Sequence, residues 1–380
     1  MIRNKSLQPA VIAGIRNLLK LSPWDRNQPP PGDQKNRPPK IPACLVFLGI
    51  VFISAGVVSC QRKPGTKESA SGPAEAYTLE SEILLEGYTV GYSTPSLNAP
   101  FYVVLSQYIQ KYAEGYGMKC LLADGQDDII KQITSIEDLV TTGVNIMIIN
   151  PLDHKALVPA VNAITERGIP VFIVDSQIDP EADYITSVQA SNEGNGELLG
   201  EWVVQKLGNQ EIKVALISGS KGNPVGREKR LGFVRGFTET QLRTKGSAEL
   251  RIVSQGWGNW THIGGLEAME DILVAYPGIN LLVAENDAMG MGALNAIQEA
   301  GKSDDILVVG FDGQKEAYEL IQTGEFGATA LNSPRELARL TIEAVVRYLN
   351  DDPMDRIIHT PAVVITRENV DRYYDPEALF

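Results

Sequence analysis

The chain has 380 residues, of which 43% are hydrophobic, and this is enough for more than one domain with a sizeable core. Its net charge is −13, and residues 1–59 carry eight Lys or Arg against two Asp or Glu, so the remainder carries −19. A body this acidic is a poor match for nucleic acid or for an anionic membrane surface, and we expect no nucleic-acid partner.

Cysteine and histidine are scarce. Cys120 is the one cysteine outside the N-terminal segment, so no intramolecular disulfide framework is expected. The three histidines are scattered without metal-ligand spacing, and neither a GxGxxG loop nor a GxxxxGK[ST] loop is present. We therefore predict no metal site and no cofactor. The Gly-rich stretch Ser218–Gly222 follows an apolar run and is either a phosphate cradle or a plain strand-to-helix turn.

The N-terminal segment has the composition of an export signal. Residues 1–40 are basic, residues 41–58 are apolar, and the run closes with Val57-Val58-Ser59-Cys60. This order is typical of a secretory signal, and its ending resembles a bacterial lipobox, in which the cysteine is lipidated. We predict a signal or anchor segment over residues 1–59 with lipidation at Cys60. The alternative is an uncleaved membrane anchor.

Residues 60–86 are rich in Lys, Gly, Ser, Ala, Pro and Glu, and we predict a disordered tether. Beyond it the sequence alternates between short apolar runs and helical patterns. This alternation predicts two doubly wound α/β lobes with parallel sheets, because one open sheet would hold too many strands. The strand candidates are Tyr88–Tyr92, Lys119–Ala123, Ile146–Ile149, Val171–Val174, Ile185–Val188, Val214–Ile217, Arg251–Ser254, Leu281–Ala284, Leu307–Phe311, Ala328–Leu331 and Ala362–Thr366.

The stretch Val144–Asp175 shows the pattern most clearly. An apolar run ends at Asn150, a helical pattern with Ala156 among its inward residues follows, and a second apolar run ends at Asp175. Strand, crossover helix and strand make the two strands parallel, so Asn150 and Asp175 meet at the same sheet edge, where open α/β sheets bind ligands. Each residue alone also fits a turn or a strand-end cap.

Other predicted strands also end in polar or aromatic residues. Asn286, Asp312 and Asn332 each follow an apolar run, and Phe101 and Tyr102 come shortly after the first strand. Taken singly, each fits a turn, a helix cap or a core position. Together they suit a sugar, because Asp and Asn match its hydroxyls and aromatic rings pack on its C–H faces. The polar loop predicted over Gly256–Thr261 supplies Trp260, another aromatic candidate.

The same residues resemble the periplasmic ribose-binding protein family of sugar-binding proteins, roughly from Tyr88 to the end. The resemblance implies the type I periplasmic binding protein fold, in which three hinge segments join two lobes and the ligand lies between them. The motifs that carry it are Ser96–Tyr102, Ile148–Asp153, Ile169–Asp175, Arg227–Phe233, Ala284–Leu294, Val308–Gly313 and Pro361–Val370.

By position, the resemblance implies that three aromatic residues stack on the sugar and six polar residues hydrogen-bond to it. Ala99 and Ser176 stand where ribose binders carry Asn and Arg, and Lys229 replaces another Arg. These departures point away from ribose itself and toward a pocket enlarged for another ligand. The implied stacking residues are Phe101, Tyr102 and Trp260, and the implied hydrogen-bonding residues are Asn150, Asp175, Lys229, Asn286, Asp312 and Asn332.

We expect an exported, lipid-anchored binding protein that delivers a monosaccharide or polyol to the permease of an ABC-type importer and performs no chemistry. The alternatives are a sensor module that feeds a membrane receptor or kinase, a sugar-processing hydrolase, and the effector domain of a lactose-repressor-type regulator. No Ser/His/Asp set supports the hydrolase, and the export signal argues against the regulator. The predicted lobes are 87–190 plus 333–358 and 191–332 plus 359–372.

Overall fold

The computed structural model describes residues 85–380, which lie within one compact unit, Ser69–Phe380. The predicted signal segment, Cys60 and the predicted tether up to residue 84 lie outside the described residues. The described chain begins packed on the core, because Leu85 N donates to Tyr116 O at 2.7 Å and its side chain joins a hydrophobic cluster.

The first sheet is parallel throughout. Its strand order is β11-β5-β4-β3-β1-β2. The order 2-1-3-4-5 is that of a doubly wound sheet, whose switch point lies between its first and third strands. The strands are β1 (Thr89–Thr94), β2 (Lys119–Asp124), β3 (Ile146–Ile149), β4 (Val171–Val174), β5 (Thr186–Gln189) and β11 (Ile357–His359).

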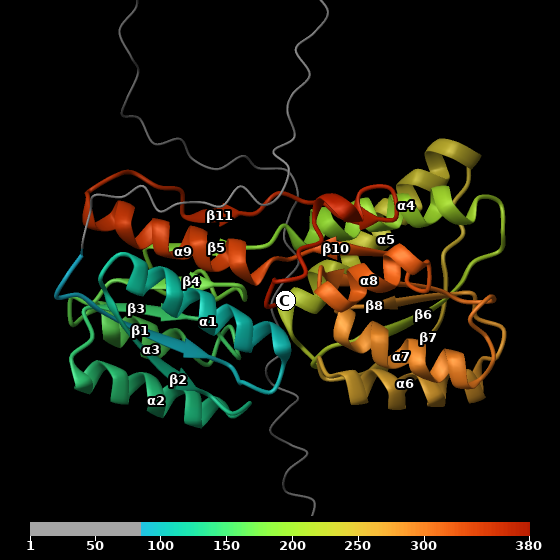
Figure 1. Cartoon of the computed structure of the whole chain (residues 1–380). Helices are drawn as coiled ribbons and strands as arrows, with labels where there is room; N and C mark the ends of the chain where they lie inside the picture. Colours follow the sequence, from blue (N-terminus) through green and yellow to red (C-terminus); the bar gives the residue numbers. More distant parts are fainter. Residues whose placement is uncertain (1–84) are drawn as a thin grey trace, which may run out of the picture. The chain divides into compact units, whose positions relative to one another are not determined.

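Helices cover both faces of this sheet because alternate strand residues point to opposite sides. Val90 and Ile148 pack in the cluster with α1 (Pro100–Gly115) and α9 (Pro334–Leu349). Met147 and Ile149 pack in the cluster with α2 (Ile129–Thr142) and α3 (Val158–Thr165). Figure 1 shows α9 and α2 on opposite sides of these strands.

The second sheet repeats the topology. Its order is β12-β10-β9-β8-β6-β7, and only β12 runs antiparallel to its neighbour. The switch point therefore lies between β6 and β8. The strands are β6 (Lys213–Ser218), β7 (Arg251–Trp257), β8 (Leu281–Ala284), β9 (Leu307–Asp312), β10 (Ala328–Leu331) and β12 (Val364–Thr366).

This sheet also has a cluster on each face. Val214 and Leu216 of β6 pack with α4 (Asn192–Leu207) and α5 (Pro224–Lys245). Ala215 and Ile217 face the cluster built by α6 (His262–Ala275), α7 (Asp287–Glu299) and α8 (Lys315–Thr323). The prediction of two doubly wound α/β sheets is confirmed.

Three local predictions differ from the structure. Ala156 is exposed, because α3 begins only at Val158 and Leu157 takes the buried position before it. Trp257 and Gly256 belong to β7 rather than to a loop, since β7 pairs with β6 up to Trp257. β11 has no counterpart among the predicted strands, because its three residues form too short an apolar run to stand out.

The chain crosses between the two sheets after β5, after β10 and between β11 and β12. We propose lobes close to those predicted from the sequence, 87–190 plus 333–358 and 191–332 plus 359–372. The third crossing moves to just after His359, because β11 still pairs with β5 there.

The C-terminal segment contacts both lobes. After the 3₁₀ turn η1 (Val370–Arg372), the Tyr374 hydroxyl donates to Glu319 Oε1 of α8 at 2.9 Å. Phe380 then packs edge-on against Phe101 of α1, with ring centroids 5.7 Å apart. The segment therefore links α8 to the start of α1.

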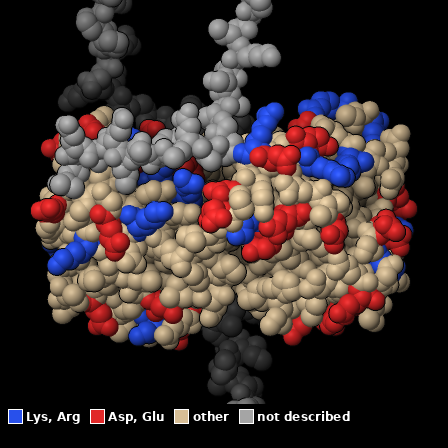
Figure 2. All heavy atoms as spheres, in the orientation of Figure 1, with Lys and Arg blue, Asp and Glu red and all other residues tan. Residues whose placement is uncertain are grey.

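The surface carries both signs of charge. On the face drawn in Figure 2, Lys and Arg are interspersed with Asp and Glu rather than gathered into one broad basic area.

Within residues 85–380, no helix combines the length and the apolar character that crossing a membrane requires.

α4 and α5 meet along a stripe of glycines. Gly196 and Gly200 of α4 lie against the backbone of α5, and Gly232 and Gly236 of α5 lie against the backbone of α4. A Cβ at any of the four would come within 3.0 Å of a backbone atom of the other helix. Gly196 lies against Lys229 O, so this contact sets the point from which the Lys229 side chain extends.

Replacing Gly232 by Ala should lower the free energy of unfolding by about 1–3 kcal/mol, because the new Cβ overlaps Glu193 O of α4 and forces the helices apart. Alanine is the better helix former, so a net loss reports the overlap and not propensity. Urea denaturation measures the difference. Gly278→Ala is the matched control, since its Cβ would meet open space. Equal stability of the two variants would disprove the close contact.

Candidate functional site

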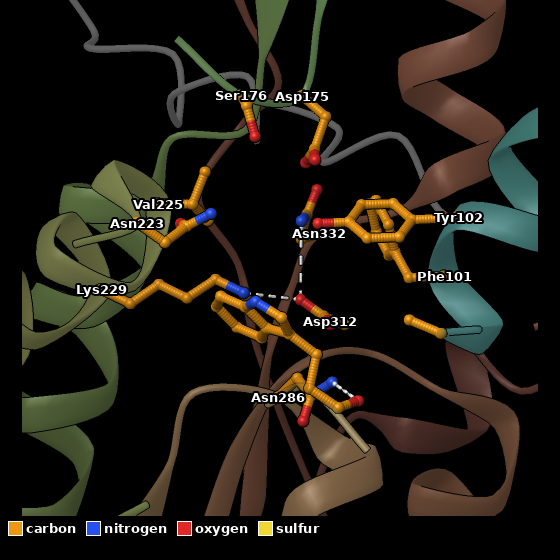
Figure 3. Close-up of a pocket in the computed structure, with 12 residues that line it drawn as sticks. Phe101, Tyr102, Asp175, Ser176, Asn223, Val225, Lys229, Asn286, Asp312 and Asn332 are labelled. Carbon is orange, nitrogen blue, oxygen red and sulfur yellow. Dashed lines mark hydrogen bonds and ion pairs between the residues drawn. The ribbon is translucent and has the colours of Figure 1, made fainter. Parts of the chain in front are cut away.

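A partly enclosed cavity lies where the carboxyl ends of strands from both sheets meet. Eight of the nine predicted ligand-binding residues line it, and the ninth, Asn150, lies behind Asp175. The lining residues are Ala99, Phe101, Tyr102, Asp175, Ser176, Asn223, Val225, Lys229, Trp260, Asn286, Asp312 and Asn332. Figure 3 shows these side chains around the cavity.

Three lining residues have left-handed backbones although none is glycine. The φ angles are 64° at Asp175, 64° at Trp260 and 107° at Asp312. Such conformations cost free energy in residues with a Cβ, and they persist where the surrounding structure holds them for a purpose. The strained backbones are thus those of Asp175, Asp312 and Trp260, three residues predicted from the sequence to bind a ligand, and each lies at or just after the end of a different strand.

Asp312 and Lys229 form a buried ion pair. Lys229 Nζ lies 2.7 Å from Asp312 Oδ1 and 2.9 Å from Glu285 O, and the two side chains are 7% and 2% exposed (Figure 3). The ammonium also lies 5.6 Å from the Trp260 ring centroid. An ammonium has three N–H donors, so one remains for a ligand. Burial raises the pKa of Asp312, and the Lys229 charge partly offsets that rise.

Asp175 follows β4 of the first sheet, and within residues 85–380 no cation lies at hydrogen-bonding distance from its carboxylate. Burial raises its pKa to about 6, against the opposing effects of an Asn150 hydrogen bond and the more distant Lys229 charge. Asn150 Nδ2 donates to Asp175 Oδ2 at 3.1 Å, and Asn150 Oδ1 accepts from Ser176 N at 3.4 Å. The Asn150 side chain thus holds the Asp175 carboxylate in its orientation, and direct contact of Asn150 with a ligand stays a prediction.

Asn332 lies between the two carboxylates, at the second crossing between the lobes. Its Nδ2 is 3.5 Å from Asp312 Oδ1, and its amide also lowers the pKa of Asp175 (Figure 3). Its Oδ1 is buried without a hydrogen-bond partner among the described residues. This oxygen is therefore available to accept a hydrogen bond from a donor in the cavity.

Aromatic rings form the apolar walls. Phe101 packs edge-on against Tyr102, with ring centroids 6.0 Å apart at 81°, and Phe380 packs on Phe101 from behind. Burial raises the pKa of Tyr102 well above its usual value, so its hydroxyl is a neutral donor and acceptor. Trp260, which follows β7 of the second sheet, also lines the cavity. The Asn286 amide donates to Trp260 O at 3.1 Å and caps α7 through Met289 N, so both of its polar atoms already have partners.

Asp287 supports the site and was not among the residues predicted from the sequence. Asn286 is the cap, and Asp287 Oδ2 accepts from Gly313 N and Gln314 N at 2.8 Å and from Thr329 Oγ1 at 2.9 Å. Burial raises its pKa to about 8. Asp287 thus fixes the turn that follows Asp312. Its place directly after a predicted strand end was the available signal.

Asn223 and Val225 also line the cavity and were not predicted. Asn223 caps the N-terminus of α5 and Val225 lies in its first turn, directly after the Gly-rich stretch. Within residues 85–380, no group of three or more His, Cys, Asp or Glu side chains is placed to hold a metal ion.

Replacing Asp175 by Asn should stabilise the fold at pH 7. Because the folded-state pKa of about 6 exceeds the unfolded value, the folded state binds more protons between about pH 4 and 6, and stability falls as pH rises through that window. The neutral amide removes this cost, and Asn tolerates the left-handed φ. We expect a gain of about 1–3 kcal/mol at pH 7 and almost none at pH 4, from urea denaturation at both values. If the variant is no more stable than the parent at pH 7, the ionised Asp175 carboxylate does not destabilise the fold.

Comparison with known proteins gives consistent matches. Residues 90–353 match the family model of the periplasmic binding protein domain. The ribose import binding protein of Bacillus subtilis (strain 168) is 34% identical over 74% of this chain and 88% of its own length. The galactofuranose-binding protein of Escherichia coli (strain K12) is 28% identical over 74% of this chain and 88% of its own.

A solved structure extends the likeness to the fold. An ABC transporter solute binding protein from Mycobacterium smegmatis with bound glycerol is 30% identical, with a TM-score of 0.68 over 75% of this chain and 96% of that one. The family model covers more than half of the 380 residues. This chain therefore belongs to the periplasmic binding protein family, in its ribose-binding-protein-like group.

Proposed function

We propose that this chain is an exported lipoprotein that binds a monosaccharide or related polyol between its lobes and delivers it to an ABC-type sugar importer. The carrying observation is the pair of buried carboxylates, Asp175 and Asp312, at strand ends of different sheets. A ligand that satisfies both must carry hydroxyl donors on opposite sides.

The polar groups of the cavity support a polyhydroxylated ligand. The two carboxylates and Asn332 Oδ1 accept hydrogen bonds, whereas Lys229 offers one remaining N–H. A hydroxyl both donates and accepts, so a ring that bears several hydroxyls can hydrogen-bond to both the acceptors and the donor of the cavity. Burying a charge without a partner is costly, and the site therefore disfavours apolar ligands.

The aromatic walls support a ring-shaped ligand. Phe101 and Tyr102 come from α1 and Trp260 from the turn after β7, so they approach from different lobes. The C–H face of a pyranose or furanose packs on such rings. Binding would hold the lobes together, and the closed surface would be the form that a permease selects.

Three positions bear on which sugar is bound. Ala99 and Ser176 line the cavity and are small, and Lys229 spends two of its three N–H donors on Asp312 and Glu285. An Arg in place of Ser176 or Lys229 would offer a ligand a two-pronged donor that these residues lack. The relatives are named for ribose and galactofuranose, and one structure holds glycerol. We infer a monosaccharide or polyol other than ribose.

Replacing Asp312 by Asn should weaken binding of the cognate ligand by about 2–4 kcal/mol, since a buried charged acceptor is lost. Asn keeps an oxygen for Lys229 and tolerates the left-handed φ, which limits damage to the fold. A thermal-shift screen of pentoses, hexoses and polyols identifies the ligand, and calorimetry measures the change.

Asp351→Asn is the matched control, because Asp351 is exposed and also left-handed, with φ 57°. Unchanged affinity in a folded Asp312→Asn variant would show that Asp312 is a turn residue only. Turnover of any sugar in the screen would favour an enzyme over a binding protein.

Export and anchoring rest on the N-terminal sequence alone. We expect mass spectrometry of the membrane fraction to find Cys60 acylated at the mature N-terminus, with residues 1–59 removed. Stable retention needs more than one acyl chain, so at least two chains are expected. An unmodified Cys60 preceded by an intact segment would instead indicate a transmembrane anchor.

A further inference from the structure

The Gly-rich stretch Ser218–Gly222 connects β6 to α5 beside the cavity. Gly219 lies directly beneath the Trp260 indole, so that a Cβ on Gly219 would overlap the ring atoms Cδ2, Cε2 and Cζ2. The φ of Gly219 is not in the left-handed region, so the indole, and not the backbone conformation, is what requires glycine here.

A buried carboxylate fixes Gly219 from below. Gly219 N donates to Glu285 Oε2 at 2.8 Å, and the other oxygen of Glu285 pairs with Arg230. Glu285 is 2% exposed, and a Cβ on Gly226 would overlap it, so it has little freedom to move. The backbone oxygen of the same residue accepts from Lys229 Nζ at 2.9 Å. Glu285 therefore contacts both Gly219, on which the indole lies, and the Lys229 ammonium.

Ser218 is also held in place. Its hydroxyl accepts from Arg230 at 3.2 Å and from Gln255 at 2.8 Å. The backbone of Trp260 is also held, because Trp260 O accepts from Asn286 Nδ2, and its conformation is left-handed. The ring is therefore fixed through its own backbone and through the surface on which it lies.

We propose that Gly219, anchored by Glu285, is a positioning residue that sets how deeply the Trp260 indole lies and thereby sets the size of ligand that the cavity accepts. This inference rests on the proposed function for its ligand, but the Gly219–Trp260 contact exists without one. A methyl group at position 219 displaces the indole from its seat. A larger ring then loses more contact than a small polyol does.

The test is a double-mutant cycle of Gly219→Ala and Trp260→Ala in the full chain. With the hexose or pentose found by the screen, Gly219→Ala should weaken binding at least tenfold, and the loss for glycerol should be smaller. In the Trp260→Ala background the same change should cost less than threefold, because the overlap is gone. Gly278→Ala, whose Cβ meets open space, should leave affinity unchanged. Additive effects of Gly219→Ala and Trp260→Ala would overturn the proposal.

A ligand-free measurement separates this inference from the proposed function. In the chain labelled with 5-fluorotryptophan, Gly219→Ala should shift the ¹⁹F resonance of Trp260, identified by its loss in Trp260→Ala. The resonance of Trp202, which lies in α4, should stay in place. An unmoved Trp260 resonance would refute the positioning role even if sugar binds. A shifted resonance with no sugar bound by any variant would uphold the contact and reject the sugar-binding proposal.

Discussion

The burial of two carboxylates at strand ends is the constraint on which the site depends. Asp175 and Asp312 are each 5% exposed when the whole residue is counted, and desolvation raises the pKa of both. Asp312 has the Lys229 ammonium at 2.7 Å, whereas Asp175 accepts from the Asn150 amide and, among the described residues, has no cation at hydrogen-bonding distance. A charge kept in such surroundings costs stability, and a site retains it when a ligand supplies the missing donors.

Most of the remaining structure holds these groups in place. The glycine contact of α4 with α5 sets the origin of the Lys229 side chain, and Asp287 fixes the turn after Asp312. Asn150 orients Asp175 from behind. The two sheets share one topology, so both present their carboxyl ends to the same cavity. The fold is therefore the means by which residues far apart in the sequence are brought to one ligand.

The strand ends could be predicted from the sequence, because parallel strands joined by crossover helices bring their carboxyl ends to one edge. Asp175 and Asp312 were found in this way, whereas Lys229 lies inside a helix and came only from the family resemblance. Three features were beyond the pattern. The Asn286 side chain donates to Trp260 O and caps α7, and both contacts depend on its side-chain rotamer. The side chain of the neighbouring Glu285 accepts from Gly219 N and pairs with Arg230, which the strand pattern does not reveal. Phe380 reaches Phe101 from the far end of the chain.

A crystal structure of the chain with the sugar that stabilises it most tests the central claim directly. The account predicts a ring between the lobes, with hydroxyls at 2.5–3.0 Å from Asp175 and Asp312, the range for strong oxygen–oxygen hydrogen bonds. It also predicts a C–H face of that ring against Trp260. A ligand bound elsewhere, or one that leaves either carboxylate without a hydroxyl partner, would contradict the account.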